Sequence, residues 1–68
     1  MIKVVNMKNY RFGKLGNIAY TGFGMLDTTS NTFLSFDGKT PYVLRTKKII
    51  QACIDGGWPE SMKRVNAA

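Results

Sequence analysis

Short runs rich in β-branched and aromatic residues predict a sheet over the first two thirds of the chain. We assign strands to residues 2–7, 18–26, 32–36 and 42–44. Residues 8–17 carry two glycines and two asparagines, which favour a loop. Asp37-Gly38 is typical of a two-residue type I′ hairpin turn, so we expect residues 32–36 to pair with residues 42–44.

The spacing of apolar residues changes to that of a helix after residue 46. We predict a helix over residues 47–55, with Thr46 as its N-cap and Gly56 as a left-handed C-cap. The residues expected to face the sheet are Ile49, Ile50, Cys53 and Ile54.

Pro59 ends this helix and suits the first turn of another, so we expect a second short helix over residues 59–65. The predicted fold class is therefore α+β: a small antiparallel sheet of three to four strands, one α-helix packed on one face, and a short C-terminal helix. Residues 1–68 form a single small domain.

Charge narrows the choice of partners. Ten Lys and Arg residues oppose four Asp and Glu residues, which gives a net charge of +6. Such a surface attracts nucleic acid, an anionic membrane or an acidic protein surface, although a basic protein without a polyanionic partner is the alternative. A homodimer stays open, because a small domain gains stability from association.

The cysteine content and the apolar stretches bear on location. Cys53 is the only cysteine, so an intrachain disulfide is impossible, and we expect it to be a buried structural residue. The chain starts without the apolar core of a signal peptide, and no apolar stretch reaches the length of a membrane span. We therefore expect a cytoplasmic protein that does not bind membranes.

The residue types for catalysis are missing or scattered. The chain has no histidine, and each of its four acidic residues falls in a predicted turn or at a predicted helix end. No cluster of Cys, His or carboxylate residues has metal-ligand spacing. Gly22-Phe23-Gly24 lacks the third glycine of a dinucleotide-binding loop. We expect no enzyme activity, no metal and no cofactor.

The strongest functional signal is positive charge where a helix should begin. Arg45, Lys47 and Lys48 surround the predicted N-cap Thr46. The helix dipole is positive at this end, so each cation there costs about 0.3–1 kcal/mol at low salt. A phosphate or carboxylate docked on the first-turn N–H groups would reverse that cost. The pattern predicts an anion-binding surface, whereas solvated side chains without a ligand are the alternative.

A second basic segment lies in the predicted loop. Lys8, Arg11 and Lys14 alternate there with Tyr10 and Phe12. Cations for phosphates and aromatic rings for bases are what a sequence-tolerant nucleic-acid surface needs. The alternative is a solvated basic loop whose two aromatic rings fold under the sheet.

Gly22-Phe23-Gly24-Met25-Leu26 locally resembles the strand motif of RNA-recognition and cold-shock domains, in which a G-F-G core carries stacking aromatics. Residues 32–36 are loosely similar to the partner strand of cold-shock domains. The resemblance lacks the basic residue before the first glycine, an aromatic at Met25 and the families' strand spacing. Its physical content is that Tyr20 and Phe23 point to opposite faces, so that only one of them can stack on a base while the other enters the core.

Two functions follow from these patterns. The first is a non-enzymatic nucleic-acid-binding module, for DNA or RNA, that works largely through phosphate contacts at both basic segments. The alternative is a small protein-binding inhibitor or adaptor, such as a phage-encoded anti-defence or host-takeover protein acting on a nucleic-acid-handling complex. Salt dependence separates them, because only a phosphate binder loses affinity for random nucleic acid with a slope near the number of phosphates contacted.

Overall fold

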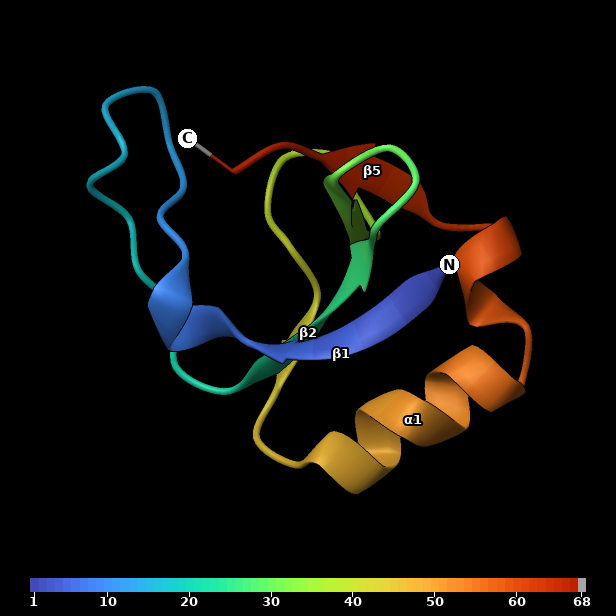
Figure 1. Ribbon diagram of the computed structural model, residues 1–68. Helices are drawn as coiled ribbons and strands as arrows, with labels where there is room; N and C mark the ends of the chain where they lie inside the picture. The colour runs from blue at the N-terminus through green and yellow to red at the C-terminus, as the bar shows by residue number, and fades with distance from the viewer. Residues whose placement is uncertain (68) are drawn as a thin grey trace.

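The computed structural model describes residues 1–67 as a five-stranded antiparallel sheet with one α-helix across one face (Figure 1). The predicted α+β class is confirmed, but the sheet has five strands and not the predicted three to four. The strands are β1 (Ile2–Asn6), β2 (Phe23–Asp27), β3 (Thr32–Ser35), β4 (Val43–Leu44) and β5 (Lys63–Val65). The helix is α1 (Lys47–Asp55), and two 3-10 turns are η1 (Met7–Asn9) and η2 (Trp58–Glu60).

Strand β2 lies at the centre of the sheet. It pairs along its whole length with β1, for example Val4 opposite Met25. Its other edge is shared, because β3 pairs with its C-terminal end and β4 with its N-terminal end. Strand β5 pairs with β3 and completes the sheet. This sharing brings the residue after β4, Arg45, to the same end of β2 as Phe23.

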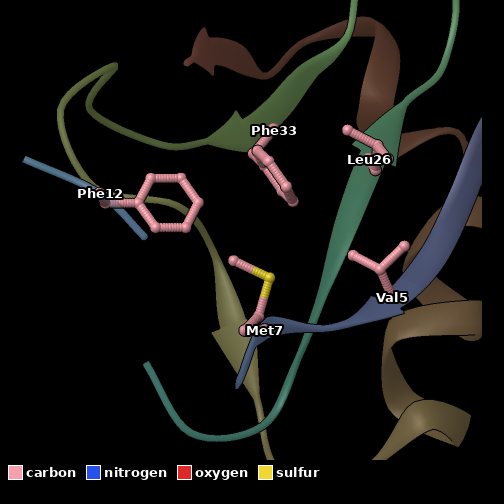
Figure 2. Close-up of a cluster of buried hydrophobic side chains, with 5 residues drawn as sticks. All are labelled: Val5, Met7, Phe12, Leu26 and Phe33. Carbon is pink, nitrogen blue, oxygen red and sulfur yellow. The ribbon is translucent and has the colours of Figure 1, made fainter. Parts of the chain in front are cut away.

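Two hydrophobic clusters cover the two faces of the sheet. One consists of Val5, Met7, Phe12, Leu26 and Phe33, whose side chains converge in Figure 2. The other lies under α1 and consists of Met25, Leu34, Ile50, Cys53 and Met62. Neighbouring residues of β1 alternate between them, Val5 in the first cluster and Val4 against the second. The buried Cys53 agrees with its predicted structural role.

The predicted C-terminal helix over residues 59–65 is wrong. Residues 58–60 form only the 3-10 turn η2, and residues 63–65 are strand β5. The edge of β3 that faces away from β2 carries backbone N–H and C=O groups that need hydrogen-bond partners. Strand β5 supplies these partners. Val65 lies opposite Phe33 and packs against the first cluster.

The predicted two-residue hairpin at Asp37-Gly38 is also wrong, because β4 pairs with β2 and not with β3. The segment forms a wider turn instead. The carboxylate of Asp37 accepts from the backbone N–H groups of Lys39 and Thr40, at 2.8 and 2.9 Å. The buried Ser35 hydroxyl accepts from the N–H of Gly38 at 2.9 Å. These side-chain bonds replace the ladder bonds of a tight hairpin.

The second strand is shorter than predicted and begins at Phe23. Ile18 instead forms an isolated bridge with Phe12, through backbone bonds of 2.8 and 3.0 Å. The positive φ of Gly22, 125°, ends the extended stretch before β2. The loop between η1 and β2 is therefore a hairpin-like excursion that projects from the sheet on the left of Figure 1.

Helix α1 has the predicted bounds, but its ends differ from expectation. Gly56 has a φ of −80°, and the left-handed conformation falls on Gly57, with a φ of 81°. Two residues of α1, Ile50 and Cys53, are buried between the helix and the sheet. Ile49, which was also predicted to face the sheet, is 54% exposed and does not join the core. None of the described helices combines the length and the apolar character that crossing a membrane requires.

Candidate nucleic-acid interface

A pocket of about 570 Å³ opens where β1, β2 and the entry to α1 meet. Residues from three separate segments line it: Asn6, Lys8, Thr21, Gly22, Phe23 and Arg45. We call it the cationic pocket. Lys8 comes from the predicted basic loop and Arg45 from the predicted helix start. The fold therefore brings one residue of each predicted basic segment to one place.

Asn6 and Lys8 are fixed by the turn that follows β1. Asn6 is the N-cap of η1, and its side-chain oxygen accepts from the backbone N–H of Lys8 at 3.1 Å. This bond orients the amide group and leaves its NH₂ donors available, while the Lys8 side chain is exposed. The pocket thus carries a cation and an amide at its β1 side.

Gly22 forms the part of the pocket where only glycine fits. Its φ is 125°, and a Cβ atom there would lie 2.5 Å from the carbonyl oxygen of Leu44. Its own carbonyl accepts from the backbone N–H of Met7 at 2.9 Å. The backbone is therefore fixed between β4 and η1, so the pocket has a rigid wall.

Phe23 supplies the aromatic surface. It is half-buried, and β2 holds it between Asn6 of β1 and Leu44 of β4. The ammonium nitrogen of Lys47 lies 5.9 Å from the ring centroid, within the range of a cation–π contact. This contact draws Lys47 of the helix start to the pocket, although it is not among the lining residues.

The side chain of the N-cap residue accepts no hydrogen bond from the backbone N–H groups in the first turn of α1. Thr46 occupies the predicted N-cap position, but its side chain makes no capping bond. The first turn contains no acidic residue, and Lys47 and Lys48 are both exposed. Positive side chains and the positive end of the dipole therefore coincide, as predicted from the sequence.

Three of the four acidic residues, Asp27, Asp37 and Asp55, make contacts elsewhere. Asp27 contacts the N-terminal ammonium at 3.8 Å and the Arg64 guanidinium at 3.6 Å. The hydrogen bond from the backbone N–H of Thr29 lowers the pKa of the Asp27 carboxyl below its ordinary value. Asp55 accepts from the Gln51 amide at 3.0 Å. Across residues 1–67, no predicted site cation has a carboxylate within 4.0 Å, so their charge is not neutralised locally.

Of the three predicted loop cations, only Lys8 lines the pocket. The Arg11 guanidinium donates to the backbone carbonyls of Lys8 and Tyr10, both at 3.3 Å, and so braces the turn beside the pocket. Lys14 is exposed in the turn closed by the bond from Gly16 N–H to the Gly13 carbonyl, outside the pocket lining.

The two aromatic rings of the same loop belong to the core. Phe12 is 2% exposed and packs edge-on against Phe33. Tyr10 also packs edge-on against Phe33, at a centroid distance of 4.8 Å. Tyr10 and Phe12 therefore follow the alternative prediction, in which the aromatic rings of this loop fold under the sheet. Tyr20 packs against the same cluster, which leaves Phe23 as the ring at the pocket.

The prediction of site residues missed Asn6 and Thr21. Asn6 lies at the end of a strand and caps a three-residue turn, which no periodicity signals. Thr21 is exposed in an irregular segment next to the pocket glycine. Only the pairing of β1 and β4 with β2 reveals that these residues share a pocket with Arg45.

A second exposed feature lies beyond the C-terminal end of α1. Phe36, Tyr42 and Trp58 form what we call the aromatic cluster, with ring centroids 4.8 to 6.2 Å apart. Phe36 is 59% exposed and Trp58 is 43% exposed. Trp58 thus packs on side chains from the turn before β4, and not on the helix cap alone.

No protein-family model, no curated protein and no solved structure matches this chain. Over residues 1–67, no three His, Cys, Asp or Glu side chains gather in a way that could hold a metal ion.

Proposed function

We propose that this protein is a non-enzymatic nucleic-acid-binding module that holds the phosphate backbone at the cationic pocket. The observation that supports it most is the convergence of Lys8 and Arg45, far apart in the sequence, on one pocket beside the Phe23 ring. Neither cation has a carboxylate partner in the described part of the chain. The net charge of +6 adds a long-range attraction for a polyanion.

Apart from the contact of Lys47 with the Phe23 ring, no contact within residues 1–67 compensates the charge at the helix start. Cations at a helix start reduce stability, and the first turn of α1 has no acidic residue to offset them. Binding to phosphate would convert that cost into affinity, and each phosphate neutralised adds about 0.7–0.9 to the salt slope. We expect Lys47 and Lys48 to add to the same surface from the first turn of α1.

Salt titration of binding to labelled DNA and RNA tests this function. We expect Lys8→Ala/Arg45→Ala to lower affinity at least about tenfold and to reduce the salt slope by about one to two. The matched control is Lys3→Ala/Lys39→Ala, which removes the same charge at exposed positions outside the pocket. We expect a clearly smaller loss for the control.

Absence of binding to every DNA and RNA probe at low salt would contradict the function. Equal losses for the two double variants would contradict the site, because net charge alone would then explain binding.

The aromatic cluster favours a second candidate, a protein-binding inhibitor or adaptor. Exposed Tyr, Trp and Phe side chains are enriched at protein interfaces, and Phe36 and Trp58 are both exposed. This candidate predicts a stoichiometric protein partner that survives nuclease treatment of a pull-down and is lost with Phe36→Ala/Trp58→Ala. A partner released by nuclease would instead support the first function.

A further inference from the structure

The cationic pocket has a composition that a nucleic-acid backbone alone does not need. Besides Lys8 and Arg45 it contains an amide, a hydroxyl and an aromatic ring, from Asn6, Thr21 and Phe23. Cations, N–H groups, amides and hydroxyls all serve as contacts to the phosphates of a duplex, so the ring is the group that the backbone does not need. The faces of paired bases are stacked on one another and are closed to such a ring. An aromatic ring gains from nucleic acid when a base is unpaired and its face is open.

The volume and the polar groups fit one nucleotide. The pocket measures about 570 Å³, which lies within the usual range of small-molecule sites, about 300–1,000 Å³. The Asn6 amide is oriented by its bond to the Lys8 N–H, so its NH₂ group is a fixed donor. The exposed Thr21 hydroxyl can donate or accept at a base edge or a sugar.

The aromatic surface is held rigidly. Phe23 lies in the central strand, with Asn6 on one side and Leu44 on the other. Gly22 beside it is fixed by its carbonyl bond to Met7 and by its close approach to Leu44. A rigid ring loses little freedom on binding, so its ordering offsets little of the stacking energy. A base on the face covered by Lys47 displaces that ammonium group from the ring.

We propose that the cationic pocket takes one unpaired nucleotide, with its phosphate between Lys8 and Arg45 and its base against Phe23. The ligand class is therefore single-stranded nucleic acid in preference to duplex. The inference rests on the proposed function and adds the state of the strand to it.

Three probes of equal length test the inference: a thymidine oligomer of about 12 nucleotides, an abasic phosphodiester strand and a duplex. The first two carry the same charge and differ only in bases. We expect the thymidine oligomer to bind about tenfold more tightly than the abasic strand, since this is the usual scale of stacking on one aromatic ring. We expect the duplex to bind no more tightly than the abasic strand.

The central variant is Phe23→Leu, which keeps an apolar side chain against the cluster under α1 and removes the aromatic face. We expect it to reduce the preference for bases below about threefold and to leave affinity for the abasic strand unchanged. Circular dichroism and melting check that it is folded.

Two further variants keep the test decisive if Phe23→Leu does not fold. Asn6→Asp keeps an oxygen that can accept from the Lys8 N–H but replaces the amide donors by a negative charge. Thr21→Val preserves the shape of an exposed residue and removes its hydroxyl. We expect each to weaken binding of the thymidine oligomer about threefold or more.

Equal affinity of the thymidine and abasic strands, with both bound and both salt-sensitive, would overturn the unpaired-nucleotide site and leave the proposed function standing. Displacement of the oligomer by thymidine monophosphate at the same concentration would also overturn it, because the pocket would then prefer a free nucleotide. If no probe binds, both the proposed function and this inference fail.

Discussion

The two ends of helix α1 present opposite kinds of surface. Before its N-terminal end, Lys8, Arg45 and Lys47 surround or adjoin one pocket, and no carboxylate within residues 1–67 neutralises them. Beyond its C-terminal end, the rings of the aromatic cluster pack on one another and carry no charge. In the first surface the cations at the helix start reduce stability, with the contact of Lys47 on the Phe23 ring as a partial offset. The second surface gains stability from its own ring contacts.

This contrast separates residues kept for binding from residues kept for the fold. Substitutions of side chains at the cationic pocket should alter binding with little change in stability. Substitutions in the aromatic cluster should alter stability and leave the affinity for nucleic acid unchanged. Each of the following predictions tests one side of that contrast.

The largest expected effect comes from Gly22, which lines the cationic pocket. Gly57, which follows the C-terminal end of α1, provides the comparison. Gly22→Ala introduces a Cβ that would lie 2.5 Å from the backbone oxygen of Leu44, at a φ of 125°. Gly57→Ala meets nothing within 4 Å at a φ of 81°. We expect losses in the free energy of unfolding of about 3 kcal/mol or more and of about 1 kcal/mol, respectively, in urea titrations.

Gly57→Ala serves as the control, because it carries the cost of positive φ without the steric clash. Equal losses for the two variants would show that the backbone around the pocket is not rigid, and would weaken the argument for a preformed site.

The next effect concerns the tryptophan of the aromatic cluster. Trp58→Ala removes ring contacts with Phe36 and Tyr42, at centroid distances of 5.9 and 6.2 Å. We expect the free energy of unfolding to fall by about 1–2 kcal/mol, because the side chain is only partly buried. Affinity of the folded variant for the thymidine oligomer should stay at the wild-type value, as measured by anisotropy. A tenfold loss would place the ligand at the cluster instead.

The two lysines of the first turn of α1 form a matched pair. Lys48→Glu should raise the free energy of unfolding by about 0.3–1 kcal/mol, because a carboxylate suits the positive end of the dipole. Lys47→Glu gains the same term but loses the contact with the Phe23 ring, so its stability should change little.

Binding separates the same pair in the other direction. Charge reversal beside the pocket should make Lys47→Glu lower affinity about tenfold, and Lys48→Glu should lower it less. Titration of both variants with one labelled oligomer measures this. Equal losses would mean that the pocket has no local influence on binding.

The smallest effect is the pH dependence of the turn that carries Phe36. Backbone N–H groups of Thr40 and Lys39 hold the pKa of the Asp37 carboxyl well below its ordinary value of 3.8. A lowered folded-state pKa stabilises the protein above pH 3.8, and that contribution is lost as the pH falls toward the folded-state pKa. Asp37→Asn should flatten the fall in melting temperature below about pH 4.

Part of the acid sensitivity should survive in Asp37→Asn, because the pKa of Asp27 is also lowered, chiefly by the Thr29 N–H. An unaltered acid profile would show that the turn bonds of Asp37 do not stabilise the fold.

Local sequence patterns predicted most of the helices and strands but little of the pairing between strands. Residues 47–55 were predictable as a helix because the apolar spacing agrees with the cap residues Thr46 and Gly56 at its two ends. Residues 63–65 were predicted as part of a second helix because Pro59 suits a helical first turn. They became a strand because the edge of β3 needed a partner, which is a non-local demand.

The candidate site shows the same limit. Charge at the helix start was visible in the sequence, and Arg45 does line the pocket. Nothing in the sequence separated Lys14 from Lys8 as a site residue. The bridge between Phe12 and Ile18 closes the loop that contains Lys14, and Lys14 does not line the pocket. Asn6 and Thr21 could not be found without knowing that β1 and β4 flank the same end of β2.

Mapping of amide chemical shifts during titration with the thymidine oligomer tests the location of the site most directly. The account predicts the largest shifts at Asn6, Lys8 and the segment 21–23, together with Arg45 and Lys47. The amides of Phe36, Tyr42 and Trp58 should stay unchanged and serve as the internal reference. Shifts concentrated on the aromatic cluster, with a silent cationic pocket, would contradict the assignment of the binding site.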